Sequence, residues 1–378
     1  MADMPDILGD AVERLEWDER KEDQTPYKKW RQVTRRTALT GGAAGIAAFA
    51  LEACGSSSKP GTASASGGSG AAGIFGSGGP YKFTLVNHVT TNPFFTPTQS
   101  GASDACKLLG CSYNWSGSQN SNVAEMVNAF QSAVSAGANG IGISLVDLHA
   151  FNSPTQSALN SGIPVVAYNA DAASNARLAY IGQDLKLSGV EMGAHIASLV
   201  PSGDVALFIA TPGALNIQPR IDGALETLKA NPSITPHVVA TGAAVPAEHS
   251  VIDAYAAGHP NTKGYFAVDA GSTQSLAQVI QSRGLRAKGV KGGGYDLTPV
   301  TEQLLAAGEI DFTIDQQPYL QGFLPILELY MYNITQKLTG IADVNTGLKF
   351  LDKTSIGPYN STKSRYEGTG TGVGVSKA

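Results

Sequence analysis

Charged side chains are scarce in this sequence of 378 residues. Asp, Glu, Lys and Arg together make up 15% of the chain, and the formal net charge is −5. Proteins that bind nucleic acid neutralise its phosphates with clustered Lys and Arg, and no such stripe is present here. The composition therefore argues against nucleic acid as a partner.

Motifs for metal binding and catalysis are missing as well. The three cysteines and six histidines are scattered, without the spacing of metal ligands. Gly292–Gly294 lacks the spacing of a dinucleotide-binding loop, and neither a Gly-x-x-x-x-Gly-Lys loop nor a Gly-x-Ser-x-Gly elbow occurs. We expect no enzyme, no metal and no other cofactor.

A hydrophobic run long enough to span a bilayer, about 20 residues, is also missing. The run at Ala38–Leu51 has about fourteen residues and follows Arg35-Arg36, so it resembles a twin-arginine export signal. Leu51–Cys54 resembles a lipoprotein box, which would make Cys54 the lipidated N-terminus. A plain signal anchor with a chance cysteine is the alternative. We expect a lipid-anchored protein on the outer face of the cell membrane, or in the periplasm.

What the sequence does contain, after this N-terminal part, is a regular alternation of strands and helices. Lys82–Val86 is rich in β-branched and aromatic residues and precedes a helix start at Asn92-Pro93, while Ile141–Val146 and Ile163–Tyr168 resemble buried strands. This alternation predicts right-handed βαβ units on parallel sheets. Because the chain is too long for one ordinary core, we expect an α/β fold with two Rossmann-like lobes.

The expected organisation is a signal, a Gly/Ser/Ala-rich tether, two lobes that each combine distant segments, and a flexible tail. In that order, the parts are 1–54, 55–80, 81–183 with 317–345, 184–316 with 346–358, and 359–378.

Polar side chains recur where the predicted strands end, which in open α/β sheets is the edge that binds ligands. This set is His88, Asn92, Asn169, Asp171, Asp269, Asp296 and Gln316, joined by Arg220 at the start of a helix. Carboxylates, amides and a guanidinium suit neighbouring hydroxyls, each of which donates and accepts a hydrogen bond. Phe94 and Phe95 can cover the apolar C–H face of a sugar or polyol. The set predicts binding of a small polyhydroxylated ligand.

Structural roles are the alternatives for several of these residues. Asn92, Asp269 and Asp296 could simply cap the helices that follow them. Arg220 could pair with Asp222 or Glu226 on the surface of its helix.

Burial alone could explain others: His88 as a hydrogen-bonded core histidine, and Phe94 and Phe95 as packing residues. Cys106 and Cys111 fit either two buried thiols or a disulfide, although five-residue spacing across a helix end disfavours the disulfide.

Several separated motifs, in order along the chain, resemble periplasmic sugar-binding proteins of the ribose-binding type, the solute receptors of ATP-binding-cassette (ABC) importers. They are Asn92–Phe95, Gly162–Val166, Ile181–Asp184, Arg220–Gly223, Gly294–Asp296 and Thr313–Gln316. The resemblance implies a type I periplasmic-binding-protein fold with an interlobe cleft, a three-strand hinge, a monomeric state and a permease partner. It implies hydrogen bonds to the sugar from Asn92, Arg220, Asp269, Asp296 and Gln316, and stacking by Phe94 and Phe95.

Three departures from that pattern point away from ribose itself. Asn169-Ala170, with Asp171 beyond, replaces an Asp-Arg pair, and His88 replaces a small polar residue. No aromatic residue stands near Val245-Pro246. We therefore expect a pentitol, a tetritol or a small aldose.

Two roles would use such a cleft. The first is delivery of the sugar or polyol to an ABC importer, and the second is a receptor that reports its ligand state to a membrane sensor kinase. The lactose-repressor family shares the two-lobed fold, but its N-terminal helix-turn-helix is replaced here by the export signal.

The lipoprotein box predicts that the mature protein begins at Cys54 and is held at the membrane. Changing Cys54→Ser should release the protein into the soluble fraction or stall its processing, because serine offers no thiol for the lipid. Cell fractionation and metabolic labelling with a fatty acid measure this, with Cys106→Ser as the matched control. A Cys54→Ser protein that still carries lipid would contradict the prediction.

Overall fold

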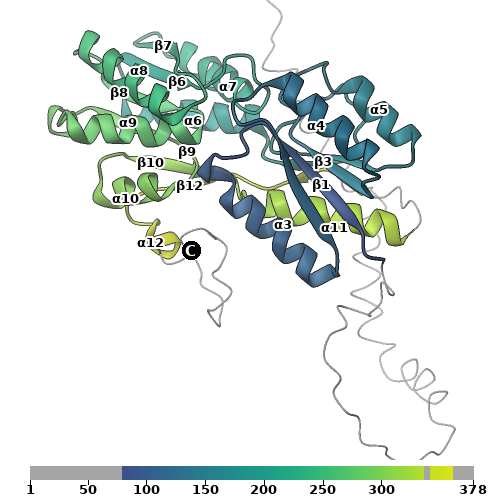
Figure 1. Cartoon of the computed structure of the whole chain (residues 1–378). Coiled ribbons are helices and arrows are strands. Elements are labelled where there is room, and N and C mark those ends of the chain that lie inside the picture. The colour runs from purple at the N-terminus through teal and green to yellow at the C-terminus, as the bar shows by residue number, and fades with distance from the viewer. Residues whose placement is uncertain (1–78, 336–340, 361–378) are drawn as a thin grey trace, which may run out of the picture. The chain divides into compact units, whose positions relative to one another are not determined.

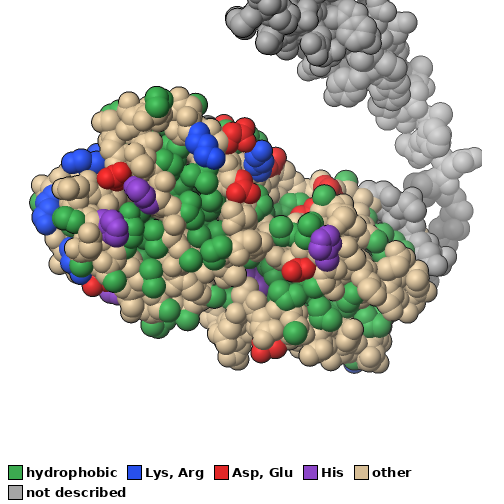
Figure 2. All heavy atoms as spheres, turned by 90° about the horizontal axis from the view of Figure 1, so that it is seen from above, with side chains coloured by type: hydrophobic (Ala, Val, Ile, Leu, Met, Phe, Trp, Pro, Cys, Tyr) green, Lys and Arg blue, Asp and Glu red, His purple; other side chains and the backbone are tan. Residues whose placement is uncertain are grey.

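The computed structural model describes residues 79–335 and 341–360 (Figure 1). The predicted export signal, Cys54, nearly all of the tether, and 361–378 of the tail lie outside the described residues. Within the described part, no helix has the length and apolar character needed to cross a membrane. On the face drawn in Figure 2, Lys and Arg are scattered and form no continuous stripe.

The first lobe is built on a parallel six-stranded sheet. Its order is β11 (Val344–Asn345), β5 (Tyr180–Gly182), β4 (Val165–Tyr168), β3 (Gly140–Ile143), β1 (Lys82–Asn87) and β2 (Ser112–Gly117). The central strands β3 and β4 are buried along their whole length, which explains why they were predictable as continuous apolar runs.

The second lobe repeats this arrangement with another six-stranded sheet. Its order is β12 (Lys349–Leu351), β10 (Phe312–Asp315), β9 (Lys291–Tyr295), β8 (Gly264–Ala267), β6 (Gly203–Ile209) and β7 (Ile234–Ala240). The edge strand β12 runs antiparallel to β10, and the other pairs are parallel. Two α/β lobes with parallel sheets are thus the observed fold class, as predicted.

Helices cover both faces of each sheet. The first lobe has η1 (Pro93–Phe95), α3 (Thr96–Leu109), α4 (Val123–Ser135), α5 (Asn152–Asn160) and α11 (Leu320–Ile334). The second lobe has α6 (Leu185–Leu199), α7 (Gln218–Lys229), α8 (Val245–Gly258), α9 (Ala270–Ser282), η2 (Arg286–Lys288), α10 (Pro299–Ala307) and α12 (Gly357–Asn360).

Neighbouring residues of one strand supply two separate cores, because alternate side chains point to opposite faces. In β1, Leu85 packs with residues of α3 and α11, whereas Val86 packs with Met126 and Phe130 of α4. The same division occurs in β6 of the second lobe, between the α6–α7 side and the α8–α9 side. Each lobe is therefore a three-layer sandwich that holds the carboxyl ends of its strands in fixed positions.

The chain passes between the two sheets three times. It leaves the first sheet after β5, returns after β10, and leaves again between β11 and β12. At these crossings Gln321 donates to Gln316 O (3.0 Å) and to Thr346 Oγ1 (3.2 Å), and Gln183 donates to Gly347 O (3.0 Å). A buried network of side-chain hydrogen bonds thus joins all three crossings.

One expectation needs adjustment. Tyr359, placed in the flexible tail by the sequence, belongs to α12, is buried, and donates a hydrogen bond to Asp315 Oδ2 (3.1 Å). An aromatic ring that can bury itself and satisfy its hydroxyl orders this segment. Cys106 and Cys111 are free thiols, with Cys106 buried.

Candidate functional site

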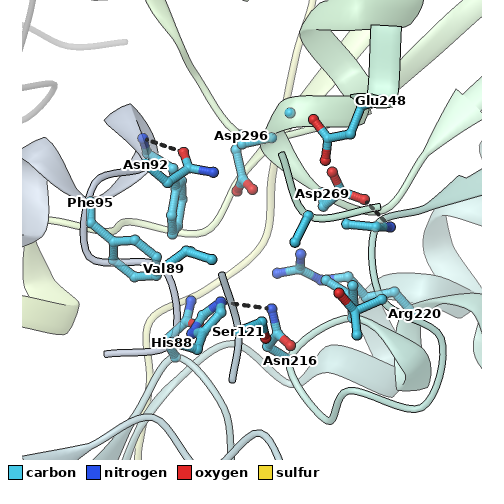
Figure 3. Close-up of a pocket in the computed structure, with 18 of the residues that line it drawn as sticks. His88, Val89, Asn92, Phe95, Ser121, Asn216, Arg220, Glu248, Asp269 and Asp296 are labelled. Carbon is cyan, nitrogen blue, oxygen red and sulfur yellow. Dashed lines mark hydrogen bonds between the residues drawn. The ribbon is translucent and has the colours of Figure 1, made fainter. Parts of the chain in front are cut away.

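A pocket lies where the carboxyl ends of strands from both lobes meet (Figure 3). It is lined by every predicted ligand-binding residue except Asp171. Those residues are His88, Asn92, Phe94, Phe95, Asn169, Arg220, Asp269, Asp296 and Gln316. Their placement in one pocket follows from the strand-end rule, because parallel strands of one sheet end at one edge.

Asp171 lies outside this pocket lining, contrary to its predicted position. Its two carboxylate oxygens accept from Arg177 Nε (2.8 Å) and Nη2 (2.6 Å), and Arg177 also contacts Asp343. The bidentate pair satisfies the Asp171 carboxylate within its own loop. This interaction was overlooked because Arg177 lies six residues away in an irregular segment.

The aromatic wall comes from the short helix η1. Asn92 caps it by accepting from Phe94 N (3.0 Å), and the helix places two consecutive rings in edge-to-face contact, with centroids 4.7 Å apart. Both phenylalanines also belong to the core of the first lobe. Capping and packing are therefore real roles of these residues, and they hold the wall rigid beside the pocket.

Arg220 is 2% exposed, which rules out the alternative of a surface ion pair. Nη1 donates to Val268 O (2.8 Å), Nη2 donates to Gln183 Oε1 (3.3 Å), and the guanidinium lies 4.0 Å from the centroid of the Tyr295 ring. Its Nε has no hydrogen-bond partner among the described atoms. The side chain is thus held by the second lobe and the hinge, and its Nε donor is left without a partner among the described atoms.

The two buried aspartates of the second lobe differ in their partners. Asp269 caps α9 and accepts from Ser272 N (2.8 Å) and Ala210 N (2.9 Å). Asp296 is not a helix cap: it has a left-handed backbone (φ 73°) and accepts from Gln316 Nε2 (2.6 Å). Burial raises the pKa of Asp296 to about 7, and the charge of Arg220 opposes that rise.

His88 is a neutral group at the end of β1. Asn216 Nδ2 lies 3.2 Å from His88 Nε2, and Ser144 Oγ lies 3.1 Å from Nδ1. With the amide donating, Nε2 is the acceptor and Nδ1–H donates to the serine. Burial lowers the pKa of His88 to about 3 because the charged imidazolium would be desolvated.

Contacts between the lobes close over the pocket. Besides the contact of His88 with Asn216, the backbone N–H of Leu215 in the second lobe donates to Val146 O in the first lobe (3.0 Å). Leu215 also packs against the first lobe's core. The described structure is therefore a form in which the two lobes touch.

Ser121, Asn216 and Glu248 are polar lining residues that had not been predicted. None follows a strand directly, so the strand-end rule could not find them. Asn216 lies in the loop before α7, and Glu248 lies in the first turn of α8.

Hydrogen-bonding capacity remains unused around the pocket. Four lining atoms are buried and have no partner among the described atoms: Asn169 Oδ1, Asn216 Oδ1, Arg220 Nε and Glu248 Oε2. Buried polar groups without partners are costly, and they suit a ligand that carries several hydroxyls. Among residues 79–335 and 341–360, no cluster of His, Cys, Asp and Glu has the arrangement of a metal site.

The lowered pKa of the buried His88 predicts that the folded protein loses stability in acid. Its pKa is near 3 in the folded protein and about 6.5 in the unfolded chain, so its contribution is complete above pH 6.5 and is lost as the pH falls towards 3. Between pH 7 and pH 5 this term should remove about 2 kcal/mol from the free energy of unfolding.

Urea denaturation at both pH values measures this loss. His88→Gln keeps a donor and an acceptor but does not titrate, so its stability should fall less than that of the parent. The exposed His149 provides the control variant, His149→Gln. Equal losses in the parent and in His88→Gln would contradict the assignment of a neutral, buried His88.

Known proteins resemble this chain along most of its described length. The family described as "Periplasmic binding protein domain" matches residues 83–335. The xylose/arabinose-binding protein XylF of Sulfolobus acidocaldarius is 51% identical over 306 residues, covering 77% of this chain and 75% of that protein.

Solved structures of sugar-binding proteins are also similar to this chain. An ABC transporter solute-binding protein of Burkholderia graminis, in complex with D-arabinose, is 26% identical with a TM-score of 0.70, and the match covers 74% of this chain and 97% of that one. GanP, a glucose-galactose binding protein from Geobacillus stearothermophilus, is 22% identical with a TM-score of 0.67, over 74% and 99%. The chain therefore belongs to the periplasmic binding protein family, a family of solute-binding proteins and not of enzymes.

Proposed function

We propose that the protein captures a pentose, of the xylose or arabinose type, in the pocket between its lobes and delivers it to an ABC importer. The observation that carries the proposal is the set of four unpartnered polar atoms around a pocket walled by Phe94 and Phe95. The name of the 51% identical relative supports a pentose over a hexose.

The balance of donors and acceptors suits an uncharged ligand. Arg220 is balanced by buried aspartates, and His88 is neutral, so an ionic ligand group would meet no free countercharge. Hydroxyls can donate to the free oxygens of Asn169 and Asn216 and accept from Arg220 Nε. The phenylalanine rings can then lie against C–H bonds of the sugar.

The cellular setting is part of the proposal. The family supports a location outside the cytoplasm, and the twin-arginine and lipoprotein motifs support a lipid anchor on Cys54. The resemblance to ribose-type binding proteins favours a monomer. Signalling to a sensor kinase uses the same cleft. A solved XylFII-LytSN complex includes a chain with a related fold, at 23% identity, and this likeness favours neither role.

A screen of the full-length protein tests the ligand class. D-xylose, L-arabinose, D-arabinose, D-ribose, D-glucose, xylitol and erythritol are compared by thermal shift and then by calorimetry. A pentose at a hundred times its Kd should add about 2.7 kcal/mol of stability. A shift only with the hexose would overturn the pentose assignment, and a preference for xylitol or erythritol would make the ligand a polyol.

Arg220 should be decisive for affinity. Arg220→Ala removes the positive charge that opposes the rise in the pKa of Asp296, and it removes the free Nε donor, so pentose affinity should fall at least tenfold, or about 1.4 kcal/mol. Arg220→Lys should recover little, because an ammonium cannot reach Val268 O and Gln183 together with the same geometry.

Calorimetry on the folded variants measures both effects. Arg283→Ala is the matched control, because Arg283 forms only a surface pair with Asp253 in the same lobe. If Arg220→Ala bound the pentose as tightly as the parent, the second-lobe half of the proposed site would be misplaced.

A further inference from the structure

Glu248 is a buried carboxyl at the pocket, and it forms no ion pair with a positively charged side chain of the described residues. It is 2% exposed, lines the pocket from the first turn of α8, and its Oε2 has no hydrogen-bond partner among the described atoms. The group fits only because residue 271 is glycine: a Cβ there would overlap Oε2. The absence of a side chain at Gly271 therefore leaves space for this carboxyl beside the N-terminus of α9.

The Asp269 carboxyl lies beside it, and the two groups point towards one another in Figure 3. Both oxygens of Asp269 accept from backbone N–H groups, those of Ser272 and Ala210, which favours the ionised form of Asp269. Glu248 Oε2 receives no such bond. Two adjacent buried carboxyls do not both ionise, so the single proton of the pair belongs on Glu248.

The electrostatics agree with this placement. Burial, followed by the charge of Asp269 and the hydrogen bond to it, raises the pKa of Glu248 to about 9, although a bond to the Ser272 hydroxyl opposes the rise. Burial raises the pKa of Asp269 too, but its backbone and side-chain hydrogen bonds, including the one from Glu248, offset part of that rise. At neutral pH, Glu248 is therefore the neutral member of the pair.

We infer that Glu248 is a specificity-determining residue: it shares its proton with Asp269 and offers its remaining hydrogen-bonding capacity to a hydroxyl of a neutral ligand. This inference rests on the proposed sugar-binding function and names the group that reads one hydroxyl at this end of the pocket. Glu248 lies in α8 near Val245-Pro246, the region where the ribose-type pattern has an aromatic residue.

The other ionisable groups around the pocket support a neutral ligand. They are Asp269 at the start of α9, Asp296 after β9, Arg220 on α7 and His88 after β1. With Glu248 and His88 uncharged, Arg220 balances Asp269, and Asp296 has a pKa of about 7. Ionising Glu248 would add a buried negative charge with no nearby cation to balance it. That charge would lower the affinity for a sugar whose hydroxyl forms a hydrogen bond there.

Calorimetry with D-xylose tests the role in binding. Glu248→Ala should weaken binding at least tenfold, and Glu248→Gln, the neutral isostere, should bind at least fivefold more tightly than Glu248→Ala. From pH 7 to pH 10 the parent should lose about tenfold in affinity as Glu248 ionises, and Glu248→Gln should lack this loss. Glu302→Gln is the control, because Glu302 is another buried carboxyl of the second lobe, outside the pocket lining.

If the parent binds D-xylose and both Glu248 variants bind it as tightly as the parent, Glu248 does not contact the ligand and the inference is wrong. A parent that binds no sugar refutes the proposed function instead. The shared proton has its own readout without ligand: infrared difference spectra between the parent and Glu248→Gln at pH 7.5 should contain a carboxylic-acid band that disappears by pH 10. Absence of that band overturns the inference whatever the ligand.

Discussion

Buried amide side chains at the three interlobe crossings connect the hinge to the pocket. Gln183, Gln316, Gln321 and Thr346 are each buried, and their bonds reach across all three segments. A buried polar group without a partner costs free energy, so these bonds restrict the paths that the crossings can take. The pocket is attached to the same network through bonds from Arg220 to Gln183, from Gln316 to Asp296 and from Asn169 to Gln321. The lining of the pocket and the hinge consequently share hydrogen-bonding groups.

Backbone conformation at the strand ends also positions polar side chains at the pocket. Asn169 and Asp296 both follow central strands and both have positive φ, at 65° and 73°. Left-handed backbone is unfavourable for most side chains and is tolerated best by Gly, Asn and Asp. The residue type at these two positions is therefore restricted twice, by the sharp turn away from the sheet and by the polar group that the pocket needs. Such turns, with polar side chains directed at a ligand, are a usual place for stored strain in binding proteins.

The sequence was sufficient for the fold and for one class of residue that lines the pocket. Alternating apolar segments predicted both parallel sheets, and the strand-end rule located residues such as His88 and Asp296, because a strand's end and the sheet edge coincide. The rule failed where position depends on packing between elements. Glu248 lies in the first turn of α8, and it reaches the pocket because Gly271 leaves space for its carboxyl. Asp171 satisfied the rule yet is bound by Arg177, a pairing set by loop geometry that no periodicity encodes.

The bond from Leu215 N to Val146 O has a kinetic consequence. It spans the two lobes, as does the contact between His88 and Asn216, so the lobes cannot separate while either persists. A sugar held between both lobes leaves only after they part, and the dissociation rate constant cannot exceed the rate constant of opening. Hinge motions of whole lobes take microseconds to milliseconds. Differences in residence time among sugars then reflect how often the occupied form opens, and the association rate reflects how much of the empty protein is already open.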